Sequence, residues 1–154
     1  MYKRQLSALE LGRINVAARS VGVAQAAFDA AMRYAQQRET FGRPIYEHQA
    51  IQFKLADMAT KLQAARLMTY DAARRADAGQ RVDMEAGMAK LFASEAAFEI
   101  ATEALRIHGG NGYTTEFPVE RYFRDTPLMI IGEGTSEIQK MVIARKLLER
   151  YPAE

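Results

Sequence analysis

The sequence predicts an all-α fold, an antiparallel four-helix bundle, on the basis of three observations. Alanine, the strongest helix former, supplies 27 of the 154 residues. Apolar residues recur every three or four positions over long stretches, without strand-like alternation or internal repeats. Four prolines and ten glycines divide these stretches from one another. With 49% hydrophobic residues, the chain can bury the core of about one domain.

The first predicted helix runs from about Leu6 to Gln36. Small and apolar residues recur along it at helical spacing: Ile14, Ala18, Val21, Ala24, Phe28, Ala31 and Ala35. Gly12 and Gly22 lie inside this helix, where each costs up to about 1 kcal/mol relative to alanine. Such a glycine indicates either a close approach to the backbone or a tolerated packing position, and the sequence leaves both open.

Two further helices follow a turn over residues 41–44. The second helix is predicted from His48 to Ala78, with Gly79 as its stop, and Asp83 is predicted to cap a third helix that ends near His108. The inward stripe of the second helix alternates steps of four and three, as in antiparallel bundles. The residues of this stripe are Ile51, Leu55, Met58, Leu62, Ala65, Thr69 and Ala72.

Residues 109–134 are predicted to form a loop of about 25 residues, which contains five of the ten glycines. Loops of this length inside a compact domain are usually functional. The last helix is predicted to start near Thr135 or Ser136, with Ser136 and Gln139 spaced as a capping box. Its predicted inward residues are Ile138, Met141, Val142 and Leu148.

Composition and charge argue against several classes of function. The net charge of +2, evenly interspersed, predicts neither nucleic-acid binding nor attachment to a membrane surface. The chain contains no cysteine, which excludes disulfides, thiolate nucleophiles and Cys-ligated metal clusters. No apolar run is long enough to cross a bilayer, and the N-terminus does not resemble a targeting signal. A cytoplasmic location is the resulting expectation.

Metal binding in the bundle is not expected. A di-iron site needs Glu-x-x-His on two helices, and the residues three before His48 and His108 are Ile45 and Leu105. A haem held by both histidines is formally possible. Histidines at helix ends, however, are more often surface or capping residues.

The glycine-rich segment contains one candidate catalytic residue. Glu133 lies between two glycines, after the apolar residues 128–131 and just before a predicted helix. A carboxylate in an apolar, partly dry setting has a raised pKa, which suits a general base. The alternative is an acidic residue favoured by the helix dipole, and the local sequence leaves both open.

Four blocks of sequence together resemble the C-terminal helical domain of the acyl-CoA dehydrogenases. The blocks are LELGRI from Leu9, RETFG from Arg38 with His48-Gln49, IHGGNGYTTEFPVER from Ile107 with Asp125, and GEGTSEIQ from Gly132. They occur in the family's order and at its separations, and the resemblance covers essentially the whole chain.

The resemblance implies a reaction and a base. Members of this family are flavoproteins that remove two hydrogens from an acyl-CoA thioester to give the 2,3-enoyl-CoA. A carboxylate takes the α-proton while the β-hydrogen leaves as hydride to FAD. In many members the base is the glutamate of the Glu-Gly-Thr motif, here Glu133, whereas others place it where this chain has Gly12.

The resemblance also implies binding residues. Glu10, Arg13 and Gly134 match substrate-contacting positions, although Glu10 and Arg13 could equally form a surface ion pair. It further implies contacts with FAD, and in several cases the FAD is the one bound by a neighbouring subunit. The matching positions are Arg38, Thr40, Phe41, Gln49, Arg106, Gly109, Gly110, Thr135 and Glu137. Arg106 and Glu137 depart from the residues common in the family, which weakens these two assignments.

The length implies that part of the family's architecture is absent. Residues 1–154 are expected to be one helical domain, without the N-terminal helical and middle β-domains of relatives. The chain would then be a recombinant piece, a fragment of a longer protein or a truncated gene product, and inactive when isolated. Implied partners are an acyl-CoA, an electron-transferring flavoprotein as acceptor, and further copies in a dimer or tetramer. The alternatives are a non-catalytic helical oligomerisation module and a relative with different flavin chemistry.

Overall fold

The computed structural model describes residues 2–153, with side chains from residue 9 onward, and confirms the all-α class. The helices are α1 (Tyr2–Gln37), α2 (Gln49–Asp77), α3 (Asp83–His108), α4 (Val119–Ile131) and α5 (Ser136–Arg150). Short elements join them: strands β1 (Glu39–Thr40) and β2 (Arg43–Pro44), and 3-10 turns η1 (Ile45–Glu47) and η2 (Gly109–Tyr113). Within this described part, no helix is long and apolar enough to cross a membrane.

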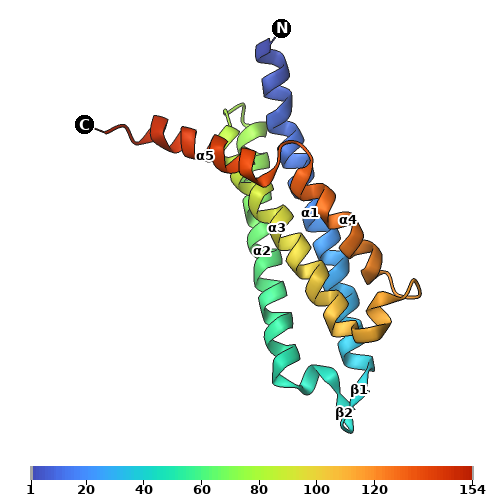
Figure 1. Cartoon of the computed structure of the whole chain (residues 1–154). Coiled ribbons are helices and arrows are strands. Elements are labelled where there is room, and N and C mark those ends of the chain that lie inside the picture. The colour runs from blue at the N-terminus through green and yellow to red at the C-terminus, as the bar shows by residue number, and fades with distance from the viewer. Residues whose placement is uncertain (1, 154) are drawn as a thin grey trace.

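The long helices α1, α2 and α3 lie side by side as an antiparallel bundle (Figure 1). Helix α3 is central, because it packs against α1, α2, α4 and α5. Helix α4 runs back along α1 and α3 from the η2 turn. The last turns of α5 point away from the bundle.

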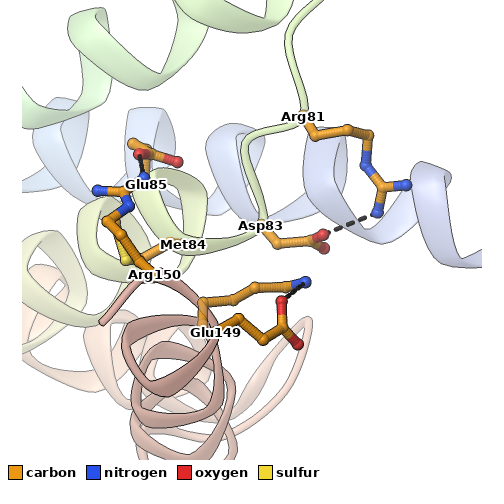
Figure 2. A pocket seen from close by; sticks show the side chains of 7 residues that line it. Arg81, Asp83, Met84, Glu85, Glu149 and Arg150 are labelled. Atoms are coloured by element: carbon orange, nitrogen blue, oxygen red, sulfur yellow. Dashed lines mark hydrogen bonds and ion pairs between the residues drawn. The ribbon is translucent and has the colours of Figure 1, made fainter. Parts of the chain in front are cut away.

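The connection between α2 and α3 differs in one detail from the prediction. Gly79 follows the end of α2 with a φ of +75°, so the predicted stop is confirmed. The predicted cap on α3 is wrong, because the N-cap residue is Val82 and makes no side-chain capping bond. Asp83 instead accepts a hydrogen bond from Arg81 at 2.7 Å (Figure 2).

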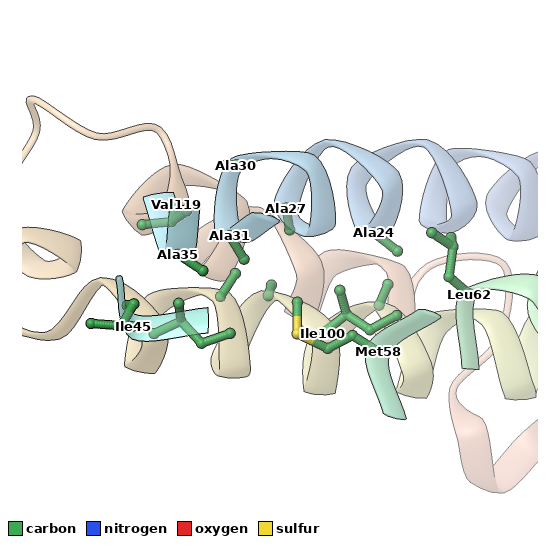
Figure 3. Close-up of a cluster of buried hydrophobic side chains, with 14 residues drawn as sticks. Ala24, Ala27, Ala30, Ala31, Ala35, Ile45, Met58, Leu62, Ile100 and Val119 are labelled. Atoms are coloured by element: carbon green, nitrogen blue, oxygen red, sulfur yellow. The ribbon is translucent and has the colours of Figure 1, made fainter. Parts of the chain in front are cut away.

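Alanines dominate the core between α1 and α3 (Figure 3). Their small side chains let the two helix backbones approach closely, and larger residues such as Ile100, Met58 and Leu62 fill the remaining space. The alanines of this cluster are Ala24, Ala27, Ala30, Ala31, Ala35, Ala97, Ala101 and Ala104. The predicted stripe of α2 is confirmed: its five residues from Met58 to Ala72 are buried, and Ile51 and Leu55 are half-buried.

The predicted 25-residue loop is wrong, because α4 occupies half of it. Pro127 lies inside this helix and cannot donate a backbone hydrogen bond to the carbonyl of Phe123. The hydroxyl of Thr126 donates to that carbonyl at 3.1 Å instead. Helix α4 therefore tolerates its proline because a neighbouring side chain replaces the lost donor.

The start of α5 was predicted correctly, but its cap and its inward face were not. Thr135 is the N-cap residue and accepts from the N–H of Ile138 at 3.4 Å, so Ser136 and Gln139 form no capping box. The residues predicted to face inward are largely exposed, Ile138 at 45%, Met141 at 67% and Leu148 at 73%, and Val142 is half-buried. The buried residues of α5 are Ser136 and Gln139.

Candidate functional site

The predicted site residues lie in two groups at opposite ends of the bundle. The first group, the Glu133 end, consists of Glu10, Arg13, Glu133, Gly134, Thr135 and Glu137. The second group, the glycine-turn end, consists of Arg38, Thr40, Phe41, Gln49, Arg106, Gly109 and Gly110. Arg13 and Arg38 are separated by about 25 helical residues, or roughly 38 Å at 1.5 Å per residue. One extended dinucleotide is shorter than this separation.

The backbone that carries Glu133 has an uncommon conformation. Glu133 has a φ of +55° and Gly134 a φ of +94°, in the short connection between α4 and α5. A left-handed conformation is unusual for a residue with a side chain, and it persists where the surroundings impose it. Here the side-chain amide of Gln139 donates to the carbonyls of Glu133 and Gly134, both at 3.0 Å.

Lys90 also holds this connection. Its fully buried side chain reaches from α3 and donates to the carbonyls of Ile130, at 2.7 Å, and Gly134, at 2.8 Å. Burial lowers the pKa of Lys90, while the nearby carboxylates of Glu95 and Glu137 act in the opposite direction. Sequence reasoning missed Lys90, although a lone lysine within the apolar stretch 86–93 was the available signal.

The carboxylate of Glu133 lies directly against α1 at Gly12. A Cβ atom at position 12 would be 2.7 Å from both Cδ and Oε2 of Glu133. Of the two interpretations that the sequence left open, Gly12 is a site of close approach, whereas Gly22 has no atom within 4 Å of its Cβ position. The side chain of Glu133 is exposed, so this chain alone does not form the dry setting expected for it.

Glu10 and Arg13 do not form the alternative surface ion pair, because both are buried. The Oε2 of Glu10 accepts from the N–H of Val82 at 3.1 Å, and its Oε1 lies 2.8 Å from the guanidinium of Arg81. Arg13 lies 3.8 Å from Asp83, and its buried Nε has no hydrogen-bond partner. Glu10 thus joins α1 to the start of α3, and the Nε–H of Arg13 has no acceptor.

Thr135 and Glu137 complete the Glu133 end. Thr135 caps α5, as described above, and Glu137 lies in the first turn of that helix. The pKa of Glu137 is lowered, chiefly by a hydrogen bond from its own backbone N–H and then by the hydroxyl of Thr135. An exposed anion is therefore stabilised at this helix terminus.

A cleft of about 320 Å³ lies near the Glu133 end, between the start of α3 and the end of α5 (Figure 2). It is lined by Met84 and by three cations and three anions: Arg81, Lys146, Arg150, Asp83, Glu85 and Glu149. These charges pair with one another, as in Arg150 with Glu85 at 3.2 Å and Lys146 with Glu149 at 2.7 Å. Because the positive and negative side chains are equal in number, the charge of this cleft favours neither an anionic nor a cationic ligand.

The glycine-turn end is built on a hairpin. Strands β1 and β2 pair antiparallel, and Phe41 and Gly42 form the turn with φ values of +53° and +76°. The predicted turn is confirmed, and Phe41 at its tip is 96% exposed. Thr40 and His48 lie within 3.1 Å of each other, Oγ1 to Nε2, which ties the hairpin to the start of α2.

A second cleft of about 420 Å³ brings part of the predicted cofactor group together. Arg38 and Thr40 on one side meet Gly109 and Gly110 on the other. Phe41, Gln49 and Arg106 do not line this cleft, and Arg106 pairs with Glu103. The remaining lining residues are Tyr34, Ile45, Ile107, His108 and Asn111.

The donor set of this cleft fits a phosphate-bearing nucleotide. A guanidinium and a hydroxyl are good partners for phosphate oxygens. A Cβ atom at Gly109 or Gly110 would meet no atom within 4 Å, so both glycines leave their surface open to a ligand.

His108 forms one wall of the cleft and is not the surface residue that was expected. It is 3% exposed, and its ring stacks on Tyr34 with 4.1 Å between centroids. Burial lowers the pKa of His108, opposed by a hydrogen bond from Nδ1 to the carbonyl of Ala104 at 2.8 Å. The neutral ring therefore packs like an aromatic side chain.

Comparison with known proteins identifies the relatives of this chain. Residues 2–148 match the model of the acyl-CoA dehydrogenase C-terminal domain. A 3-(aryl)acrylate reductase of Clostridium sporogenes is 54% identical over 94% of the chain and 38% of its own length. A probable acyl-CoA dehydrogenase of Bacillus subtilis, YngJ, is 54% identical over 96% of the chain and 39% of its own length.

Comparison with solved structures leads to the same family. A chain in the structure of the electron transferring flavoprotein of Acidaminococcus fermentans has a TM-score of 0.94 and 46% identity. The match covers 96% of this chain and 39% of that one, so the chain spans about two-fifths of the length of the proteins it matches. The chain belongs to the acyl-CoA dehydrogenase family and corresponds to the family's C-terminal helical domain.

Proposed function

We propose that this chain is the C-terminal domain of an FAD-dependent enzyme that converts an acyl-CoA thioester to the 2,3-enoyl-CoA, with Glu133 as the base. The observation that carries the proposal is the placement of the Glu133 carboxylate against Gly12. The two positions that supply the base in different relatives thereby meet at one point. This chain has a carboxylate at one of them and a glycine that leaves room for it at the other.

The chemistry assigned to this chain is a proton transfer. The Glu133 carboxylate takes the α-proton, and the electrons of that C–H bond form the double bond as the β-hydrogen leaves as hydride. FAD, when bound, supplies the hydride acceptor. The left-handed backbone of Glu133 directs its side chain toward α1, where the thioester's α-carbon would have to lie.

The same carboxyl group can serve in the opposite direction. A base that removes the α-proton in oxidation returns it in reduction, because both directions share one transition state. One relative is named a reductase and another a dehydrogenase. We therefore assign the α,β carbon–carbon bond as the reacting bond. We also assign an electron-transferring flavoprotein as the redox partner, because a similar chain occurs in a structure of such a flavoprotein.

Substrate contacts are proposed for Arg13, Glu10 and Gly134. The unpartnered, buried Nε of Arg13 supports a direct contact, because an unsatisfied donor is costly to bury. Glu10 already has two partners, which supports a role in fixing the position of α1. Gly134 adjoins the base and would present its backbone to the thioester.

FAD binding is proposed to involve two copies of the chain. The predicted FAD contacts Thr135 and Glu137 lie at the Glu133 end and the others lie at the glycine-turn end, so each end would serve a different FAD. Exposed apolar residues on α5, such as Met141 and Leu148, support burial against another subunit in a dimer or tetramer. The N-terminal helical and middle β-domains would supply the remaining contacts, including those that shield Glu133.

Replacement of Glu133 tests the proposed base. In the flavoenzyme that carries this domain, Glu133→Gln should slow bleaching of the flavin by acyl-CoA by about 10²-fold or more. Glu149→Gln, an exposed glutamate on α5, is the matched control and should bleach at the normal rate. Rapid bleaching by Glu133→Gln would show that another group is the base. A full-length protein that assembles but binds neither FAD nor acyl-CoA would favour the non-catalytic assembly module.

A further inference from the structure

The connection from α4 to α5 leaves several backbone carbonyls that need hydrogen-bond donors. The last carbonyls of α4 have no partner within their own helix, and the left-handed residues 133 and 134 cannot continue the helical ladder. Buried carbonyls without donors are costly. Two fully buried side chains, Lys90 from α3 and Gln139 from α5, donate to three of these carbonyls, those of Ile130, Glu133 and Gly134.

The four hydrogen bonds of these side chains converge on one short segment. Gln139 donates to the carbonyls of Glu133 and Gly134, and Lys90 donates to those of Gly134 and Ile130. The carbonyl of Gly134 therefore accepts from both side chains. The atoms that hold the backbone of Glu133 come from two helices that also pack against each other.

Packing alone gives no reason for a lysine at position 90. Residues on either side of it in α3 are small or apolar, and burial of an amine costs far more than burial of an apolar chain of similar length. The lowered pKa of Lys90 reflects this cost. A methionine would fill a similar volume but would leave the carbonyl of Ile130 without a donor and that of Gly134 with Gln139 as its donor.

We propose that Lys90 and Gln139 are positioning residues, which hold residues 130–134 so that the Glu133 carboxylate stays against Gly12. This role rests on the proposed function of Glu133. The hydrogen bonds of Lys90 and Gln139 go to backbone carbonyls, so both residues act through the position of the base. The catalytic step assigned to Glu133 would slow when either donor is removed, because an error of about 1 Å in a reacting group costs about 10²-fold in rate.

A structural test uses the 154-residue chain itself. Lys90→Met and Gln139→Met each remove two of the four hydrogen bonds and keep an unbranched side chain. We expect the backbone amides of residues 130–132, the last hydrogen-bonded amides at the end of α4, to exchange with solvent deuterium about tenfold faster in both variants, while amides of α2 are unchanged. Lys140→Met, an exposed lysine on α5, is the matched control and should exchange like the parent. Unchanged exchange at residues 130–132 in both variants would overturn the proposal.

A functional test measures removal of the α-proton directly. In the flavoenzyme that carries this domain, loss of deuterium from an acyl-CoA labelled at C2 reports on the base. Lys90→Met and Gln139→Met should slow this loss by about 10- to 100-fold, with KM changed by less than about threefold. Lys140→Met should leave both values unchanged.

The outcomes separate this proposal from the proposed function. If Glu133→Gln blocks deuterium loss and the two positioning variants match Lys140→Met, Glu133 remains the base and the positioning role is wrong. If Glu133→Gln leaves deuterium loss intact, the base assignment itself fails and the role of Lys90 falls with it. Slow loss of deuterium in all three variants, Glu133→Gln, Lys90→Met and Gln139→Met, supports both the base and the positioning role.

Discussion

The two ends of the bundle use glycine-rich segments in opposite ways. At the Glu133 end, the backbone of residues 130–134 is held by buried donors, and the glycine at position 12 is occupied by the Glu133 carboxylate. At the glycine-turn end, Gly109 and Gly110 face open space beside an exposed Arg38. The first segment positions one of the protein's own side chains, and the second leaves room for a ligand.

The role of a glycine therefore depends on the atoms that lie opposite its missing side chain. Gly12 and Gly110 are both ordinary in their φ angles, yet one lies against a carboxylate and the other against an open cleft. Substitutions that add one methyl group therefore probe the two ends separately.

The largest effect is expected for Gly12→Ala. Its methyl group would overlap the Glu133 carboxylate, which would move outward, and we expect α-proton removal in the flavoenzyme to fall by about 10²-fold. Stability should hold or rise by up to about 1 kcal/mol, because alanine is the better helix former. Gly22→Ala is the control, with a similar gain in stability and normal activity. Equal activity of the two variants would contradict the close contact.

The next effect concerns α4, which joins the two ends. Thr126→Val leaves the carbonyl of Phe123 without a donor and should lower the free energy of unfolding by about 1–3 kcal/mol. Adding Pro127→Ala restores a backbone N–H at that carbonyl and should recover most of the loss. Denaturant unfolding of the single and double variants measures both steps. No recovery in the double variant would refute this account of the proline.

Gly109 and Gly110 form a matched pair at the glycine-turn end. Gly109 has a φ of +58° and a ψ of −135°, a conformation that residues with a side chain rarely adopt, so Gly109→Ala should cost about 1–3 kcal/mol of stability. Gly110→Ala requires no strained conformation and should change stability by less than about 0.5 kcal/mol. Both added methyl groups would enter the cleft, and both should weaken FAD binding to the flavoenzyme, as measured by fluorescence titration. Normal FAD affinity in both variants would remove this cleft from the cofactor site.

The smallest effect is a pH dependence from His108. Burial lowers its pKa below the ordinary 6.5, so the unfolded chain binds the proton more readily than the folded one. The contribution of His108 to the free energy of unfolding should therefore be fully present above about pH 6.5. It should fall as the pH drops from there toward the lowered pKa. Unfolding curves between pH 8 and 5 measure this slope, and His108→Phe should flatten it. The same slope in the variant would mean that another group is responsible.

The sequence predicted the parts of the fold that repeat locally. The stripe of α2, the stop at Gly79 and the turn at Phe41 follow from helical spacing and from glycine conformations, and all three are confirmed. Helix α4 was missed because Pro127 and the flanking glycines are typical of loops. The hydroxyl of Thr126 replaces the N–H that Pro127 lacks, and this role can be recognised only when the carbonyl of Phe123 is known to be without its helical donor.

Composition, helical spacing and the four motif blocks are enough to predict an alanine-rich helical domain of the acyl-CoA dehydrogenase family, with Glu133 as a candidate base. Folding alone brings Gly12 to Glu133, Glu10 to Val82, and Lys90 to Gly134. These pairs are 40 or more positions apart along the chain, so no local pattern encodes them. Glu10 with Val82 and Lys90 with Gly134 form because packing around α3 buries polar groups that need hydrogen-bond partners, whereas Gly12 meets Glu133 because the connection from α4 to α5 lies against α1.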